Sequence, residues 1–77
     1  MKQGVVIFST TTGVMQAERV LLKAGFEIKI VPTPREFSTD CGIAIRFDWK
    51  NAEKIRTALG SQAIGISAIH PLDENKN

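Results

Sequence analysis

The order of hydrophobic patterns along the chain limits its fold more than any other feature of the sequence. Residues 5–8 (VVIF) form a continuous apolar run rich in β-branched residues, which is typical of a central β-strand. Residues 26–31 (FEIKIV) alternate between apolar and charged side chains, which predicts a half-buried strand. Two further strands are predicted at 43–47 and 63–69, and Pro71 is expected to end the last one.

Between the first two predicted strands the pattern becomes helical. Apolar residues recur at spacings of three and four between positions 13 and 24, as they do on the buried face of a helix. Thr11 or Thr12 is the predicted N-cap, since a threonine hydroxyl can accept from an N–H group of the first turn. Gly25 follows immediately and predicts the C-terminal end.

A second helix is predicted after the third strand. Asp48 is a suitable N-cap, and Ala52, Ile55 and Leu59 form the apolar stripe that should face the core. The dipeptide at 60–61, Gly-Ser, is expected to end this helix.

The resulting order, β-α-β-β-α-β, fits an α+β ferredoxin-like sandwich, in which two helices cover one face of a four-stranded antiparallel sheet. We expect one domain at 1–72 and a disordered polar tail at 73–77. In the usual strand order 4-1-3-2, the loop after strand 1, the loop before strand 3 and the turn before strand 4 lie at one end. The helix-free face is expected to be mostly polar, with these residues: Glu27, Lys29, Ala44, Arg46 and Ser67.

Composition excludes several classes of function. The net charge is only +2 and the basic residues are scattered, which argues against nucleic-acid binding. No apolar run approaches the length of a membrane span. With one cysteine and one histidine, the 77-residue chain lacks the ligands of a zinc site and cannot form an internal disulfide, so we predict no metal, no cofactor and a cytoplasmic location. The exposed edge strands could pair with a second copy of the chain, so a homodimer is one possible assembly.

The single cysteine lies at the end of a stiff polar loop, PTPREFSTDCG (32–42), where the third strand begins. We expect Cys41 to be accessible there and close to the N-terminus of the first helix, whose partial positive charge favours a thiolate or persulfide. His70 is expected on the surface at the opposite end of the sheet. The residues that could stabilise an anion on the sulfur, or leave space beside it, are Ser9, Thr10, Thr11, Thr33, Arg35, Ser38 and Gly42.

Other roles for this cysteine stay open at this point. A lone cysteine usually fills a small apolar space in a core, and stiff loops also occur for stability alone. Without thiol chemistry, the chain would be a small ligand-binding or regulatory ferredoxin-like domain, or a protein-interaction module that uses only the scaffold. If Cys41 reacts in the folded protein, thiol chemistry is favoured over both of these roles.

Two segments, AERVLLKAG (17–25) and PTPREFSTDCG (32–42), resemble a small bacterial family of selenium or sulfur carrier-like domains, and the similarity extends over about residues 5–70. The resemblance implies a carrier, not an enzyme, that holds a persulfide or selenosulfide on Cys41. It would receive the atom from a donor such as a cysteine desulfurase and pass it to an acceptor enzyme. Many relatives carry a histidine just before the serine of the first loop, whereas here Phe8 precedes Ser9.

Overall fold

The secondary structure has the predicted order of strands and helices, with different bounds. The computed structural model describes residues 2–37 and 41–72. Ser38 and the tail at 73–77 lie outside the described residues. Within the described residues, two 3-10 helices, η1 and η2, accompany four strands and two α-helices. The elements are β1 (Gln3–Ile7), α1 (Thr11–Lys23), β2 (Ile28–Pro32), η1 (Arg35–Phe37), β3 (Ile43–Asp48), η2 (Trp49–Asn51), α2 (Ala52–Ser61) and β4 (Ala68–Leu72).

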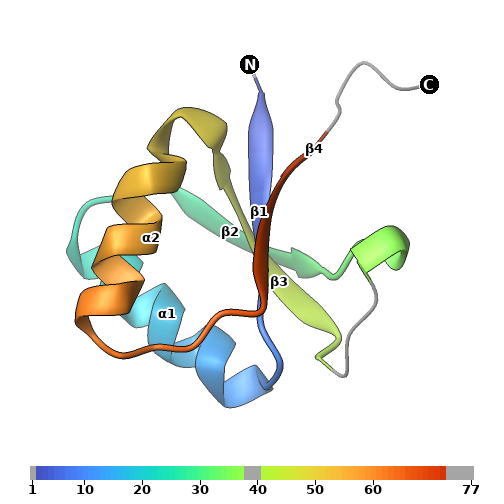
Figure 1. The fold of residues 1–77 in the computed structure, drawn as a ribbon, viewed down its shortest axis with the longest axis horizontal. Coiled ribbons are helices and arrows are strands. Elements are labelled where there is room, and N and C mark those ends of the chain that lie inside the picture. Colours follow the sequence, from blue (N-terminus) through green and yellow to red (C-terminus); the bar gives the residue numbers. More distant parts are fainter. Residues whose placement is uncertain (1, 38–40, 73–77) are drawn as a thin grey trace.

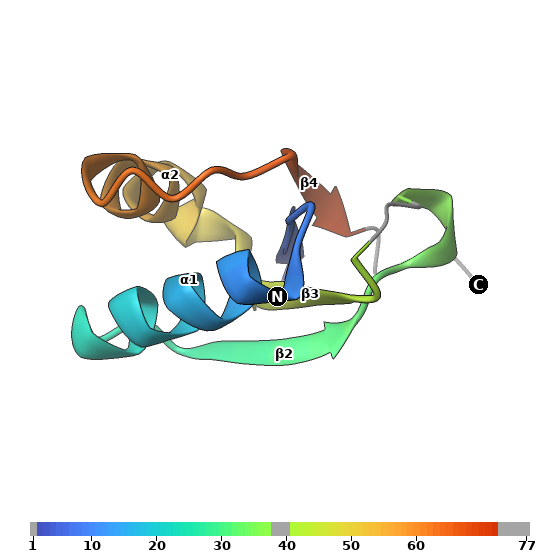
Figure 2. The same ribbon diagram turned by 90° about the horizontal axis from the view of Figure 1, so that it is seen from below.

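The four strands form one antiparallel sheet in the order β2-β3-β1-β4, which confirms the predicted ferredoxin-like arrangement. Both helices cover the same face of this sheet, as Figures 1 and 2 show. β1 and β3 are central, while β2 and β4 are the edges. The main core lies between the sheet and the helices. Its buried members are Val6, Phe8, Val14, Ala17, Leu21, Cys41, Ile45, Phe47, Ile55 and Leu59.

The ends of α1 follow from short-range hydrogen bonds. Thr10 is the N-cap, and its side chain accepts from the Gly13 N–H at 3.0 Å, so the prediction of Thr11 or Thr12 was wrong by one or two residues. At the other end, Gly25 has a φ of +92°. The N–H groups of Gly25 and Phe26 donate to Leu22 and Leu21, which is the pattern of a Schellman C-cap. Gly25 therefore ends α1 as predicted.

α2 begins and ends with less regular backbone. The Asp48 side chain accepts from the Lys50 N–H at 3.2 Å, so it caps the 3-10 turn that leads into α2. The helix ends at Ser61, as the dipeptide Gly60-Ser61 predicted, and the chain reverses at Ala63, which has a φ of +58°. A second Schellman pattern forms there, since Ala63 and Ile64 donate to Gly60 and Leu59.

The prediction of the last strand was wrong in its position and in the face that it presents, since Ala68, and not Ser67, packs on the helix-free side of the sheet. β4 begins at Ala68, five residues later than expected, and includes Pro71 opposite Gly4 of β1. β4 is an edge strand, and at an edge proline's missing N–H group can face solvent without the loss of a ladder hydrogen bond. Ile64 and Ile66 still pack against the main core, but they do so from a connecting segment.

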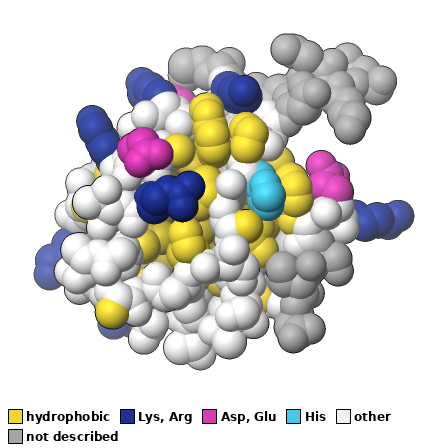
Figure 3. All heavy atoms as spheres, viewed as in Figure 1, with side chains coloured by type: hydrophobic (Ala, Val, Ile, Leu, Met, Phe, Trp, Pro, Cys, Tyr) yellow, Lys and Arg dark blue, Asp and Glu magenta, His cyan; other side chains and the backbone are white. Residues whose placement is uncertain are grey.

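Lys29, Ala44 and Arg46 lie on the helix-free face as predicted, because they pair in register with one another or with Val5 and Ile7, but this face also carries a second apolar cluster that was not expected. Val5, Ile7 and Ala44 are buried on this face. Phe37 of η1 packs against them, since the loop after β2 folds back over the sheet on the side away from the helices (Figure 2). The space-filling view shows apolar side chains beside the histidine (Figure 3). The other residues that pack on this cluster are Val31, Ala68 and Leu72.

Candidate functional site

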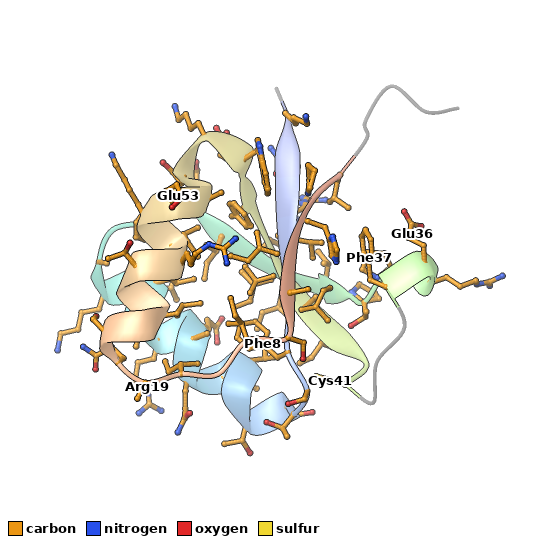
Figure 4. All side chains as sticks on the ribbon, in the orientation of Figure 1. Phe8, Arg19, Glu36, Phe37, Cys41 and Glu53 are labelled. Carbon is orange, nitrogen blue, oxygen red and sulfur yellow. The ribbon has the colours of Figure 1, made fainter. Side chains whose placement is uncertain are left out.

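The segments predicted to carry the site meet at one end of the sheet. The β1–β3 ladder ends at the pair Ile7–Ala44, so the chain that leaves β1 and the chain that enters β3 lie side by side there. The backbone N–H of Ser67, just before β4, donates to the Ile7 carbonyl at 2.7 Å. Figure 4 shows Cys41 and Phe8 together at this end, beside the start of α1. The expected gathering of these loops is confirmed.

Cys41 is buried, which contradicts the expectation of an accessible thiol. Only 3% of the residue is exposed, and it belongs to the main core together with Phe8 and Val14. The reason is the two-residue period of extended chain, which directs Cys41 to the same side as Ile43 and Ile45. The Sγ–H group donates to the Ile43 carbonyl at 3.3 Å. Phe8, the residue before Ser9, is fully buried.

Thr33 holds the backbone on both sides of the Cys41–Gly42 peptide bond. Its hydroxyl donates to the Cys41 carbonyl at 2.9 Å, and its N–H donates to the Gly42 carbonyl at 3.0 Å. These two hydrogen bonds extend the pairing of β2 with β3 beyond the last ladder pair, Pro32–Ile43. In this arrangement Thr33 directs its proton to a carbonyl oxygen, so it positions Cys41 through the backbone.

The residues at the start of α1 form an exposed polar rim near the buried cysteine. Ser9, Thr10 and Thr11 are all exposed, and Thr10 is engaged as the helix cap. Gly42 is also exposed, and a Cβ built on it would meet no atom of the described residues within 4 Å. The described part of the chain therefore leaves the backbone next to Cys41 uncovered.

Arg35 lies elsewhere. It is exposed on η1, which lies on the helix-free side of the sheet, whereas Cys41 packs on the helix side (Figure 2). The structure therefore brings Thr33 and Gly42 to Cys41 through the backbone, but it does not place Arg35 in the core where the thiol lies.

Sequence reasoning missed an aromatic contact between the cysteine loop and β4. The rings of Phe37 and His70 are stacked, with centroids 4.1 Å apart and an interplanar angle of 4°. His70 is half-buried opposite Val5, in the middle of β4, so its expected place at the far end of the sheet was wrong. No periodic pattern could have revealed this contact, because it depends on how a loop folds back over the sheet.

Two observations concern the described residues as a whole. Between positions 2–37 and 41–72, no three histidine, cysteine or acidic residues come together as a metal site would require. No helix in these ranges is long and apolar enough to cross a membrane.

Comparison with known proteins gives one match. The family model described as "Putative Se/S carrier protein-like" matches residues 3–71, nearly the whole chain. No curated protein matches. No solved structure matches.

Proposed function

Because the chain belongs to this family of Se/S carrier-like proteins, we propose that it carries a sulfur or selenium atom on Cys41 and passes it between two enzymes. One observation carries the proposal: the only cysteine of the chain lies where three loops and the start of α1 meet, next to the exposed Gly42. The partners would be a donor such as a cysteine desulfurase and an acceptor enzyme. The protein would then be a reactant, with no catalytic turnover of its own.

The loading step is an exchange between sulfurs. The Cys41 thiolate attacks the outer sulfur of a persulfide on the donor, a new S–S bond forms on Cys41, and the donor thiolate leaves. The outer sulfur keeps its oxidation state, so loading requires no external oxidant or reductant. Delivery repeats the step, because an acceptor thiolate attacks the outer sulfur and Cys41 leaves as a thiolate. Selenium would follow the same route as a selenosulfide.

The surroundings of Cys41 suit a carrier that protects its cargo. A persulfide anion would lie near the N-terminus of α1, whose partial positive charge favours anions. Ser9 and Thr11 add exposed hydroxyl groups on the same rim. Burial of the cysteine would shield the outer sulfur from other thiols, but it also means that exchange requires Cys41 to leave the core.

The test is to incubate the folded protein with a cysteine desulfurase and L-cysteine without oxygen, and to measure the intact mass. We expect a gain of one sulfur atom on the wild-type chain and none on Cys41→Ser, which contains no thiol. A control is the double variant Cys41→Ser/Ser61→Cys, which moves the only thiol to an exposed position at the end of α2.

Loading of the wild type but not of the Ser61→Cys double variant would support a specific role of the Cys41 environment. Equal loading of both would indicate non-specific transfer to any thiol. No loading of the wild type, under conditions in which Cys41 can be alkylated, would contradict the proposal and favour the ligand-binding domain.

A further inference from the structure

An open hollow on the helix-free face of the sheet lies at the end opposite Cys41. Its volume is about 270 Å³. Its polar lining consists of Gln3, Glu27, Lys29, Arg46 and Asp48. Gln3 and Asp48 form the first pair of the β1–β3 ladder, whereas Cys41 lies beyond the last pair of that ladder. The hollow is therefore separate from the candidate site around the cysteine.

Two cationic residues stand directly opposite each other in this hollow. Lys29 of β2 pairs with Arg46 of β3, and Arg46 pairs in turn with Val5, which is buried on the helix-free face. Cross-strand partners lie on the same face of a sheet, and like charges in this position destabilise the pair. Arg46 is half-buried, so water screens the repulsion less than it would on an open surface. An anionic group between the two side chains would remove this cost.

Neither cation is neutralised by the described part of the chain. Between positions 2–37 and 41–72, no ion pair or hydrogen bond engages the side chain of Lys29 or Arg46. The exposed carboxylate of Glu27 is also unpaired within these ranges. Asp48 differs, because its Oδ1 accepts from the Lys50 N–H at 3.2 Å and its Oδ2 lies 4.0 Å from Lys50 Nζ. The hollow therefore offers a guanidinium, an ammonium and one carboxylate to a ligand.

We propose that this hollow binds a free α-amino acid as a zwitterion, with the ligand carboxylate between Lys29 and Arg46 and the ligand ammonium at Glu27. A guanidinium can donate two parallel hydrogen bonds to a carboxylate, and a lysine ammonium adds another donor. Phosphate fits less well, since the carboxylates of Glu27 and Asp48 repel a dianion. This site goes beyond the carrier function and does not depend on it, because no residue of its lining takes part in thiol exchange.

The experiment is a titration of the isotope-labelled protein with L-alanine, L-glutamine and L-methionine, followed by the NMR shifts of its backbone amides. These probes share the zwitterionic head group and differ only in the side chain. For at least one of them we expect saturable shifts that are largest at residues 27–29 and 46–48. The N-acetyl derivative of that amino acid lacks the ammonium, and its methyl ester lacks the carboxylate. Each should bind about tenfold more weakly or worse, because a hydrogen bond between charged groups is lost.

Variants of the two cations test the location of the ligand carboxylate. Arg46→Gln and Lys29→Gln should each weaken binding by about tenfold or more. The matched control is Lys54→Gln, which removes the same charge from an exposed position on α2, on the other side of the sheet (Figure 1). It should bind like the wild type. Without ligand, Lys29→Gln should also unfold at a higher temperature than the wild type, because the repulsion from Arg46 is gone.

Several results would overturn the proposal. One is the absence of saturable shifts with all three amino acids at their highest soluble concentrations. Another is binding of the N-acetyl derivative or of inorganic phosphate as tight as that of the amino acid, which would indicate a site for simple anions. Unchanged affinity in Arg46→Gln, or a Lys29→Gln variant less stable than the wild type without ligand, would contradict the role of the cation pair. Desulfurase loading is a separate measurement, so failure of the carrier function and failure of this site are distinguishable.

Discussion

Replacing Thr33 by valine removes one hydrogen bond and almost nothing else. Valine has nearly the same shape, so the hydroxyl that donates to the Cys41 carbonyl at 2.9 Å is lost, while the backbone bond from residue 33 to Gly42 stays. Such a bond contributes about 0.5–1.5 kcal/mol. If that energy opposes local opening, the substitution should raise the exposed fraction of Cys41 by about two- to tenfold.

The assay is the alkylation rate of Cys41 in the absence of denaturant, together with urea unfolding followed by circular dichroism. The control is Ser61→Ala. Ser61 also donates from its hydroxyl to a backbone carbonyl, that of Ala58, at 2.9 Å, but at the far end of α2. It should leave the alkylation rate unchanged.

A Thr33→Val variant with a lower free energy of unfolding but the wild-type alkylation rate would contradict this role of Thr33. The same role would be refuted if Ser61→Ala accelerated alkylation equally. The first result would mean that Cys41 becomes accessible through an opening that keeps the Thr33 hydrogen bond, and the second that its accessibility does not depend specifically on the end of the β2–β3 ladder.

Two further predictions concern the scaffold, and thermal unfolding tests both. A Cβ on Gly4 would lie 2.8 Å from Phe47 Cζ and would also clash with the Trp49 ring, so Gly4→Ala should cost about 1–3 kcal/mol and lower the melting temperature by several degrees. Equal stability of Gly4→Ala and wild type would show that these rings move aside without cost. Ala63 has a φ of +58°, where an L side chain costs about 1–2 kcal/mol. Part of this cost is offset by the extra chain entropy that glycine has in the unfolded state, so Ala63→Gly should raise the free energy of unfolding by about 0.5–1 kcal/mol. Gly25→Ala, at a φ of +92°, should lower the free energy of unfolding by about 1 kcal/mol. If Ala63→Gly and Gly25→Ala changed the free energy of unfolding in the same direction, backbone strain at positive φ would not explain their effects.

Most of the fold was predictable because its signals are local and periodic. The alternation at 26–31 and the helical spacing before Gly25 each identify an element without knowledge of the rest of the chain. The last strand was not predictable in this way. Ile64 and Ile66 alternate as in a strand, but they fill the core from a connecting segment, and the pairing partner of β1 begins only at Ala68.

The site was predictable in its location but not in its accessibility. Strand order alone brings the loops at 8–10 and 41–42 together, and this was expected. The polar residues before Cys41 suggested exposure, yet the two-residue period that Cys41 shares with Ile43 directs its side chain inward. The contact between Phe37 and His70 is a meeting of a loop with an edge strand, and no local pattern in the sequence encodes it.

As a carrier, Cys41 must accept a sulfur or selenium atom and give it up again. The most direct measurement is the intact mass of protein first loaded by a desulfurase, then separated from it and mixed with a small acceptor thiol. We expect one added sulfur on the loaded wild-type chain, no addition on Cys41→Ser, and return to the original mass as the acceptor thiol receives the sulfur. A chain that is never loaded, or that keeps its added sulfur in the presence of the acceptor, would contradict the carrier function.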